Sequence, residues 1–321
     1  QQVNISSQFG FICQPCSVWM TGNNSDGLLG TNDTIDLQEF TNLSDICFEQ
    51  MYLTYFYSVG YTEEETWVSG LQYISNQSLT NFTKFNNDQF GLSSWWLSQL
   101  TDGNKIVRSA KWSIGSKETL KIGFLLGQTI KQIGGLQKSM FIVTQSEIYS
   151  NNDQSYLENG VRTMVSDEWG KMKLPDGVQI ILNVRFTCNN VILVDSNGKF
   201  YANGQNIVSK LCNSSTENQQ EFLSFGKLKN LLISWTASYQ VQIDGSVTFC
   251  GQLNNQSSYI MTIQPKILEL PQLNSKRLLD LAATNTGLMS LTQDADGKKS
   301  VHYMGSSTEN DFGVYASNSA W

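Results

Sequence analysis

The chain has 321 residues, a formal net charge of −7, 40% apolar residues and only 15% charged ones, against about 25% charged in a typical soluble domain. The negative balance argues against a nucleic-acid partner, because phosphate binding needs a basic face. No apolar run approaches the roughly 20 residues that a bilayer-spanning helix needs. Low charge, many neutral polar residues and a start at Gln1 instead of Met suggest a mature extracellular chain, or the ordered part of a longer protein.

One pattern recurs along the chain: a strand, a polar turn, a second strand and a small residue, usually Gly. It first ends at Gly22, in CSVWMTG, and then recurs in stretches that end at Gly70, Ala110, Asn152, Gly204, Gly251 and Gly305. The spacings between these anchors are 48, 40, 42, 52, 47 and 54 residues. A quasi-regular period of this size indicates one supersecondary unit that is repeated.

Hairpin signals occupy the turns of this unit. Asp-Gly or Asn-Gly pairs, which favour tight turns between strands, occur at Asp102-Gly103, Asn197-Gly198, Asp244-Gly245 and Asp296-Gly297. Only residues 116–133 and 217–233 have a composition compatible with a long helix. We therefore predict an all-β fold, a seven-bladed β-propeller with four strands in each blade, as a single domain over residues 1–321. The segments before Gly22 and after Gly305 are expected to share a blade and close the ring.

The first repeat has the most specific sequence, VWMTGNNSDGLLG. It resembles the repeat signature of the RCC1 (regulator of chromosome condensation) superfamily, with Leu28 where Gln is usual and with family residues at Gly22, Asn24, Gly27, Leu29 and Gly30. The stretches LMSLTQDADGKKSVHYMG and VILVDSNGKFYANGQN are similar to the hairpin that precedes this turn in the family. The resemblance spans the chain from about Ser17 to Phe312.

This resemblance implies a seven-bladed propeller but not one function. Some members are guanine-nucleotide exchange factors for the small GTPase Ran, and others are ubiquitin-ligase modules, ciliary scaffolds or secreted inhibitors. The exchange factors use an insertion and an acidic patch, and no stretch of this chain maps onto those residues one by one. Fold therefore does not fix function here.

Residues that carry chemistry are sparse. The single histidine, His302, lies in a predicted strand and is expected to be structural. No phosphate-binding loop, HExxH motif or dinucleotide fingerprint occurs, so we predict no enzyme activity, no cofactor and no metal. Cys13 and Cys16 form a CxxC pair and are a candidate disulfide, although pairing with other cysteines or buried thiols are equally open readings. The other cysteines, Cys47, Cys188, Cys212 and Cys250, are scattered singly, which disfavours zinc.

N-glycosylation sequons gather in the first 83 residues, where six of the seven asparagines belong to one. Glycans need exposed loops, and Asn23, in the tight repeat turn, is the least suitable. The candidate glycosylation sites are Asn4, Asn32, Asn42, Asn76, Asn81, Asn213 and Asn255.

Charge is also uneven along the chain. Residues 1–83 contain no Lys or Arg, whereas residues 103–138 contain seven bases and one acid. Candidate acidic interaction residues are Asp33, Asp36, Glu39, Glu63, Glu64 and Glu65, and candidate basic ones are Lys105, Arg108, Lys111, Lys117 and Lys121. Opposite patches can attract each other between molecules, but two ordinary solvated faces explain the pattern as well.

These observations predict a non-enzymatic, rigid propeller that binds proteins. We expect a secreted glycoprotein, stabilised by disulfides, that assembles with itself or with a partner protein. The alternatives are a cytosolic or ciliary scaffold with unused sequons, and an exchange factor for a small GTPase in a reducing compartment.

Overall fold

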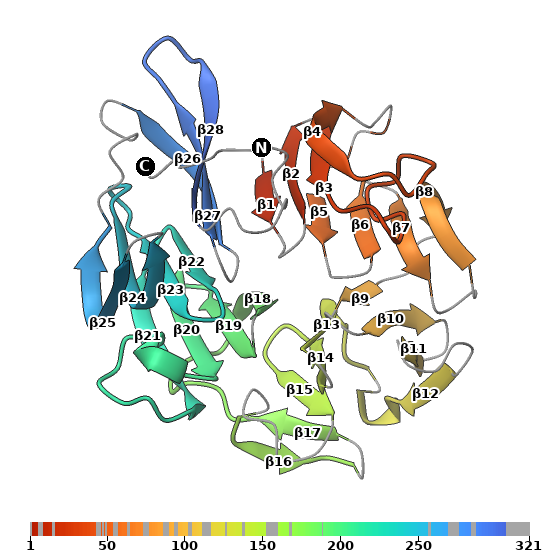
Figure 1. The fold of residues 1–321 in the computed structure, drawn as a ribbon. Helices are drawn as coiled ribbons and strands as arrows, with labels where there is room; N and C mark the ends of the chain where they lie inside the picture. Colours follow the sequence, from red (N-terminus) through yellow and green to blue (C-terminus); the bar gives the residue numbers. More distant parts are fainter. Residues whose placement is uncertain are drawn as a thin grey trace. The chain divides into compact units, whose positions relative to one another are not determined.

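The computed structural model describes residues 2–5, 9–14, 17–42, 46, 48, 50–53, 57–62, 65–72, 77–85, 90–92, 96–101, 105–110, 117–125, 127–136, 139–151, 160–166, 169–187, 189–255, 258–268, 276–283 and 287–305. These residues form antiparallel strands in seven sheets, joined by turns and short 3-10 helices. Figure 1 shows the strands in chain order. The prediction of an all-β fold is confirmed.

The chain divides into two compact units, of which unit 1 comprises residues 1–88, 254–260 and 269–321. Its three sheets follow the chain, each strand pairing with the next. They are β1 (Gln2–Ile5), β2 (Phe9–Gln14), β3 (Ser17–Gly22) and β4 (Leu37–Asn42); β5 (Gln50–Leu53), β6 (Tyr57–Tyr61), β7 (Thr66–Gln72) and β8 (Gln77–Phe85); and β26 (Arg277–Ala283), β27 (Gly287–Gln293) and β28 (Lys299–Gly305).

Unit 2 comprises residues 89–253 and 261–268. Its sheets are β9 (Phe90–Leu92), β10 (Trp96–Thr101), β11 (Lys105–Ala110) and β12 (Lys117–Lys121); β13 (Gln132–Leu136), β14 (Ser139–Val143), β15 (Ile148–Asn151), β16 (Arg162–Met164) and β17 (Trp169–Met172); β18 (Ile181–Thr187), β19 (Asn190–Asp195), β20 (Lys199–Gly204) and β21 (Gln219–Lys227); and β22 (Asn230–Ile233), β23 (Ala237–Val241), β24 (Val247–Asn255) and β25 (Ser258–Ile267). The 3-10 helices among the described residues are η1 (Gly123–Leu125) and η3 (Ile207–Ser209). The end of the β24–β25 hairpin, residues 254–260, belongs to unit 1.

The prediction of seven four-stranded blades is wrong for the described residues. Five sheets have four strands, the β13–β17 sheet has five in the order β13-β14-β15-β17-β16, and the β26–β28 sheet has three. The extra strand arises because the chain after β15 forms a hairpin, β16–β17, whose second strand pairs with β15. The single domain over residues 1–321 stays a prediction.

The predicted sharing of a blade by the two chain ends stays a prediction, because residues 306–321 lie outside the described residues. Among the described residues, the N-terminal segment supplies both β1 and β2, which pair with each other in the β1–β4 sheet. No described strand of the β26–β28 sheet pairs with β1. The two sheets are nevertheless neighbours within unit 1, because β1 contacts β26 and β27 (Figure 1).

The repeat anchors other than Asn152, which lies outside the described residues, occupy one structural position, on the third strand of a sheet. Four of them, Gly22, Gly70, Gly204 and Gly251, share φ values between 96° and 114°, a region that side chains disfavour. A Cβ atom on Gly204 would lie 2.2 Å from the carbonyl oxygen of Asn189. The turn before β19 therefore approaches so closely that a side chain does not fit at Gly204, and the carbonyl oxygen of Thr236 lies at the same distance from a Cβ atom on Gly251.

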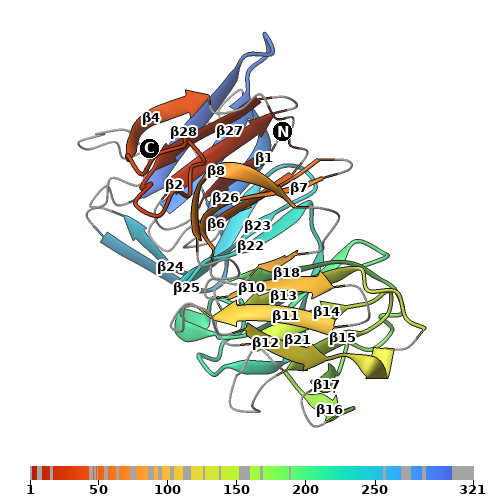
Figure 2. The same ribbon diagram turned by 90° about the vertical axis from the view of Figure 1, so that its right-hand side faces the viewer.

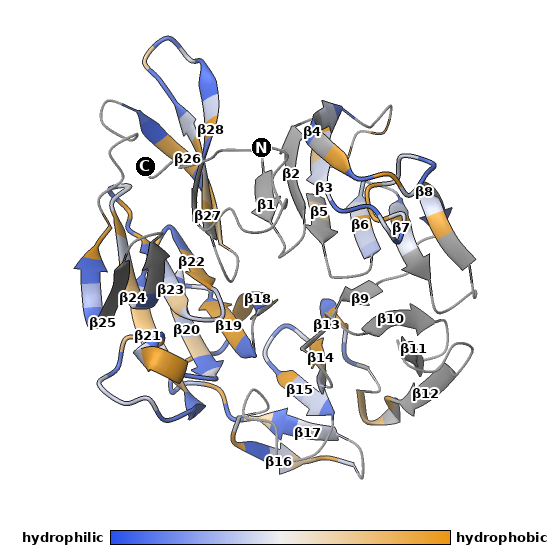
Figure 3. Ribbon diagram, viewed as in Figure 1, coloured by the Kyte–Doolittle hydropathy of each residue, from blue (hydrophilic) through white to orange (hydrophobic). Residues whose placement is uncertain are grey.

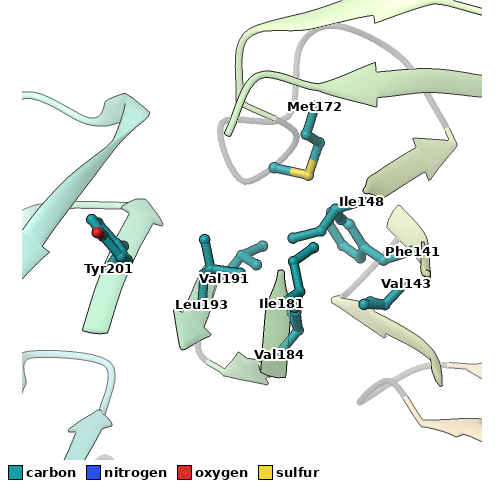
Figure 4. Close-up of a cluster of buried hydrophobic side chains, with 9 residues drawn as sticks. All are labelled: Phe141, Val143, Ile148, Met172, Ile181, Val184, Val191, Leu193 and Tyr201. Carbon is teal, nitrogen blue, oxygen red and sulfur yellow. The ribbon is translucent and has the colours of Figure 1, made fainter. Parts of the chain in front are cut away.

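Buried apolar side chains join neighbouring sheets. One cluster in unit 2 contains Phe141, Val143, Ile148, Met172, Ile181, Val184, Val191, Leu193 and Tyr201. Figure 4 shows these side chains on strands of the β13–β17 and β18–β21 sheets, with Tyr201 set apart from the others. The apolar strands β19 and β22 stand out in Figure 3. This packing forms a stiff frame for the turns that follow each third strand.

Candidate functional site

The turn after β3 is built around Asn24, which is fully buried. Its Nδ2 group donates to Thr31 Oγ1 at 2.8 Å and to the carbonyl oxygen of Asp33 at 3.1 Å. Its Oδ1 atom accepts from the backbone N–H of Leu29 at 2.8 Å. One side chain therefore fixes a turn of about ten residues by bonding to a buried backbone N–H, a carbonyl oxygen and a hydroxyl.

This turn also attaches its own sheet to the next one. The carbonyl oxygen of Leu28 accepts from Ser58 Oγ at 2.7 Å and from Ser69 Oγ at 2.9 Å, and both serines are fully buried on the β5–β8 sheet. A Cβ atom on Gly30 would lie 2.4 Å from the ring of Phe82. The family-like residues of the first repeat thus form a joint between two sheets.

A second turn of the same kind follows β20. Fully buried Asn206 donates to Asn213 Oδ1 at 2.5 Å and accepts from the N–H of Leu211 at 2.7 Å. Lys210, which corresponds in spacing to Leu28, is also fully buried, and its Nζ atom donates to the carbonyl oxygen of Ser234 at 3.1 Å. The same joint therefore links the β18–β21 and β22–β25 sheets of unit 2.

A disulfide reinforces this second joint. It connects Cys212, at the end of the turn, with Cys250 on β24, across a sequence separation of 38 residues. Gln240 Nε2 lies 2.8 Å from Cys212 Sγ, and Ser238 Oγ lies 3.5 Å from the same sulfur. The sequence pattern does not predict this pair, because the two cysteines meet only where one sheet packs on the next.

The predicted Cys13–Cys16 disulfide lies partly outside the described residues. Cys13 lies on β2, where its backbone pairs with Val18, whereas Cys16 is not described. That disulfide stays a prediction.

The sequon asparagines fall mainly in unit 1. Asn32, Asn42 and Asn81 have exposed side chains, and Thr31 pairs with Asn81 in an isolated bridge, so two sequons lie side by side. Asn4 lies on β1 and Asn255 at the end of β24, whereas Asn76 lies outside the described residues. Asn213 is half-buried, with its Oδ1 atom engaged by Asn206.

The candidate acidic residues are partly used inside unit 1. Asp33 accepts from Thr31 Oγ1 and from the N–H of Ile35, and these hydrogen bonds lower the pKa of its carboxyl. Asp36 accepts from the N–H of Asn24 at 2.7 Å. Glu65 forms an ion pair with Lys84 and accepts from Trp67 Nε1 at 3.1 Å. Glu39 is exposed, and Glu63 and Glu64 lie outside the described residues.

The candidate basic residues lie on neighbouring strands of unit 2. Lys105 on β11 is opposite Lys121 on β12, Arg108 is opposite Glu118, and Lys117 is opposite Ser109. These strands lie side by side in Figure 2. Lys111 is outside the described residues. The structure thus brings Lys105 and Lys121 opposite each other in register, and the predicted basic interaction surface stays a prediction.

His302 lies on β28 and is half-buried. Its Nε2 atom lies 3.0 Å from Thr292 Oγ1. Burial and the nearby Lys276 charge lower the pKa of the imidazole. Within the described ranges, no group of His, Cys, Asp or Glu side chains is arranged to bind a metal ion, and no helix is long and apolar enough to cross a membrane.

No protein-family model matches the sequence, and no curated protein does. Solved structures match it in fold. Human WBSCR16 is similar over 96% of this chain and 87% of its own, with 12% identity and a TM-score of 0.66. Prp20p of Saccharomyces cerevisiae, the yeast RCC1, is similar over 96% of this chain and 83% of its own, with 13% identity and a TM-score of 0.66.

A third match is the ectodomain of the Physcomitrella patens receptor kinase CR4, with 10% identity, 95% of this chain and 74% of that chain covered, and a TM-score of 0.55. At this identity the likeness concerns the fold alone. Together with the sheet order, the anchor glycines and the buried asparagine turns, it shows that the chain is an all-β propeller with the RCC1-like fold.

Proposed function

We propose that this chain is a non-catalytic protein-binding propeller that works outside the cell or in the secretory pathway and carries N-linked glycans on unit 1. The main support for this proposal is the distribution of exposed side chains between the two units. Exposed sequon asparagines lie in unit 1, whereas all the exposed large apolar side chains described, except Trp19 and Ile35, belong to unit 2. Glycans shield the surface around them, so unit 2 is the surface left for a protein.

The apolar side chains of unit 2 suit such contacts. Ile243, in the β23–β24 turn, is 73% exposed, and Leu182 is 66% exposed. Leu182 lies at a β-bulge, where the register shifts between Ile181 and Asn183. A β-bulge changes the direction in which a side chain points, and bulges are common next to functional sites. Large apolar side chains on a stiff sheet are typical of contact surfaces.

Two further observations support the secretory setting. The CR4 match is described as the ectodomain of a receptor kinase, so this fold is used in an ectodomain. The Cys212–Cys250 disulfide fits an oxidising compartment.

The intact mass of the natively purified protein tests this proposal. We expect a large decrease after N-glycosidase treatment and a gain of a few daltons after reduction. A mass equal to that of the bare chain, with six free thiols, would contradict the secretory setting.

Self-association is one form that binding can take. The excess of acids in residues 1–83 and of bases in residues 103–138 favours contact between copies. Asp33, Asp36 and Glu65 are already bonded within unit 1, so Glu39 is the described candidate best placed to contribute. Sedimentation velocity at low and high salt tests this form. A larger species at low salt that dissociates at high salt supports it, and one monomeric species at both contradicts it.

Exchange-factor activity is the second candidate, favoured by the fold shared with Prp20p, whose structure is described with its binding to Gsp1p and histones. Release of a fluorescent GDP from a Ran-type GTPase would test it, with Prp20p as the positive control. Release that this chain accelerates would place it with the exchange factors, and release at the intrinsic rate would remove that candidate.

A further inference from the structure

The turn after β20 has an unfavourable backbone conformation. Val208, Ser209 and Cys212 have φ values of 54°, 56° and 58°. At the matching positions of the first repeat, three and six residues after the buried asparagine, Gly27 and Gly30 have φ values of 75° and 69°. Glycine adopts this left-handed region freely, whereas a residue with a Cβ atom does not. The second turn therefore needs a stronger attachment than the first.

The two turns are attached to the next sheet by different kinds of bond, and the turn with the unfavourable backbone has the covalent one. In the first joint, two serine hydroxyls bind the carbonyl oxygen of Leu28. In the second, the Cys212–Cys250 bond fixes the end of the turn to β24. The turn lies close against this strand, because a Cβ atom on Gly251 would be 3.1 Å from the Cα atom of Lys210.

The two sulfur atoms have different environments. Cys250 is fully buried, whereas Cys212 is half-buried as a residue and is therefore the less enclosed of the two cysteines. Gln240, whose side chain is only 6% exposed, directs Nε2 towards both sulfurs, at 2.8 Å from Cys212 and 3.9 Å from Cys250. This amide is closer to Cys212 than to Cys250, so the negative charge that it stabilises best is the charge on Cys212 when that sulfur is released.

We propose that the Cys212–Cys250 disulfide is a redox-sensitive site that controls the turn at residues 206–216. The thiolate of a dithiol reductant attacks Cys212 Sγ and forms a new S–S bond, and Cys250 leaves as a thiolate that takes up a proton. The second thiol of the reductant then attacks its own sulfur in this mixed disulfide and releases Cys212, which is also protonated. The products are two protein thiols and the oxidised, cyclic reductant.

Reduction removes the covalent attachment, and the left-handed residues then favour departure of the turn from the β22–β25 sheet. The joint that normally covers Lys210 and Ser234 opens as a result. This inference goes beyond the proposed function and does not depend on it, because it concerns one sheet junction in unit 2.

Hydrogen exchange of the full chain, with and without dithiothreitol, tests the proposal. We expect residues 206–216 to exchange at least ~10-fold faster after reduction, while β19 keeps its protection. The monothiol 2-mercaptoethanol is expected to be trapped on Cys212. Unchanged exchange in the turn, reduction only under conditions that also unfold β19, or trapping on Cys250 would each overturn the proposal.

Two matched variants separate backbone strain from loss of the bond. C212S/C250S keeps a Cβ atom at the left-handed position, whereas C212G/C250S restores the glycine of the first repeat. We expect residues 206–216 to exchange ~5- to 10-fold faster in the serine variant than in the glycine variant, since both lack the bond and only one is strained. Equal exchange in both would show that strain does not open the turn.

Discussion

At the scale of single residues, buried asparagines determine the turns. Asn24 and Asn206 are each fully buried, and each accepts from the backbone N–H five residues later. A shorter or apolar side chain cannot replace these bonds. Removing such a side chain leaves several buried backbone groups without partners, which costs about 1–3 kcal/mol for each group.

We expect Asn24→Ala to lower the free energy of unfolding by about 2–4 kcal/mol, because the N–H of Leu29 and the polar groups of Thr31 and Asp33 lose their shared partner. Urea unfolding of protein made without glycans measures this. The matched control is Asn23→Ala, since Asn23 Oδ1 accepts only local, exposed bonds from Ser25 in the described contacts. Its cost is expected to stay below about 0.5 kcal/mol. Equal losses in the two variants would contradict this role of Asn24.

His302 predicts a pH dependence of stability. Burial lowers its pKa in the folded chain, so the unfolded chain binds more protons below pH ~6.5. Stability should therefore fall as the pH decreases from about 7 to 5.5, by less than about 1 kcal/mol, because the side chain is partly exposed. No second imidazole contributes to this pH dependence, because the chain has only one histidine. Urea midpoints measured across this range should become flat in His302→Gln, and a persistent slope would assign the effect to other groups.

At the scale of elements, each turn works through its fit against the next sheet. Gly30 shows this, because it combines a left-handed φ of 69° with close packing against Phe82 on β8. Gly198 has a similar φ of 72°, but nothing lies within 4 Å of a Cβ atom placed on it. Alanine substitutions at these two glycines therefore distinguish the free-energy cost of the left-handed backbone from the cost of displacing a packed side chain.

Gly198→Ala should therefore lower the free energy of unfolding by about 1 kcal/mol, which is the cost of the left-handed backbone alone. Gly30→Ala carries the same cost and must also displace Phe82, so we expect a total loss above about 2 kcal/mol. Thermal or urea unfolding distinguishes the two. Similar losses would mean that the turn shifts away from β8 without penalty.

The repeat anchors could be predicted from the sequence because glycine and the hairpin signals recur at a regular distance. Four anchors do share one backbone conformation. The β16–β17 hairpin could not be predicted from the sequence, because strand pairing that skips a neighbouring strand leaves no periodic signal in the chain. The disulfide was missed for the same reason: Cys212 and Cys250 meet only through the packing of one sheet on the next.

At the scale of the whole molecule, this chain shares a fold with proteins to which it is 13% identical or less, so the fold does not identify its binding surface. The position of exposed apolar side chains could not be read from the sequence. Leu182 and Val184 both look like core residues of an apolar strand, yet one is 66% exposed and the other is buried. The β-bulge between Ile181 and Asn183 causes this difference.

Variants of unit 2 should therefore separate binding from folding. Leu182→Asp and Ile243→Asp are expected to change the free energy of unfolding by less than about 0.5 kcal/mol, because both side chains already face water. Each should weaken a partner complex or self-association at least ~10-fold, as measured by sedimentation or calorimetry, since contact residues lose their apolar surface. Ile35→Asp, in unit 1, is the matched exposed control. Binding that survives both unit 2 changes would place the contact surface elsewhere.

The joints between sheets also have a consequence for synthesis. Leu28 is anchored by serines that lie 30 and 41 residues further along the chain, and Cys212 by a cysteine 38 residues further. At about 5–20 residues per second, a ribosome needs roughly 2–8 s to make such a stretch. During synthesis each of these two turns therefore lacks its partner for that time. It is fixed in place only after the following sheet has been made.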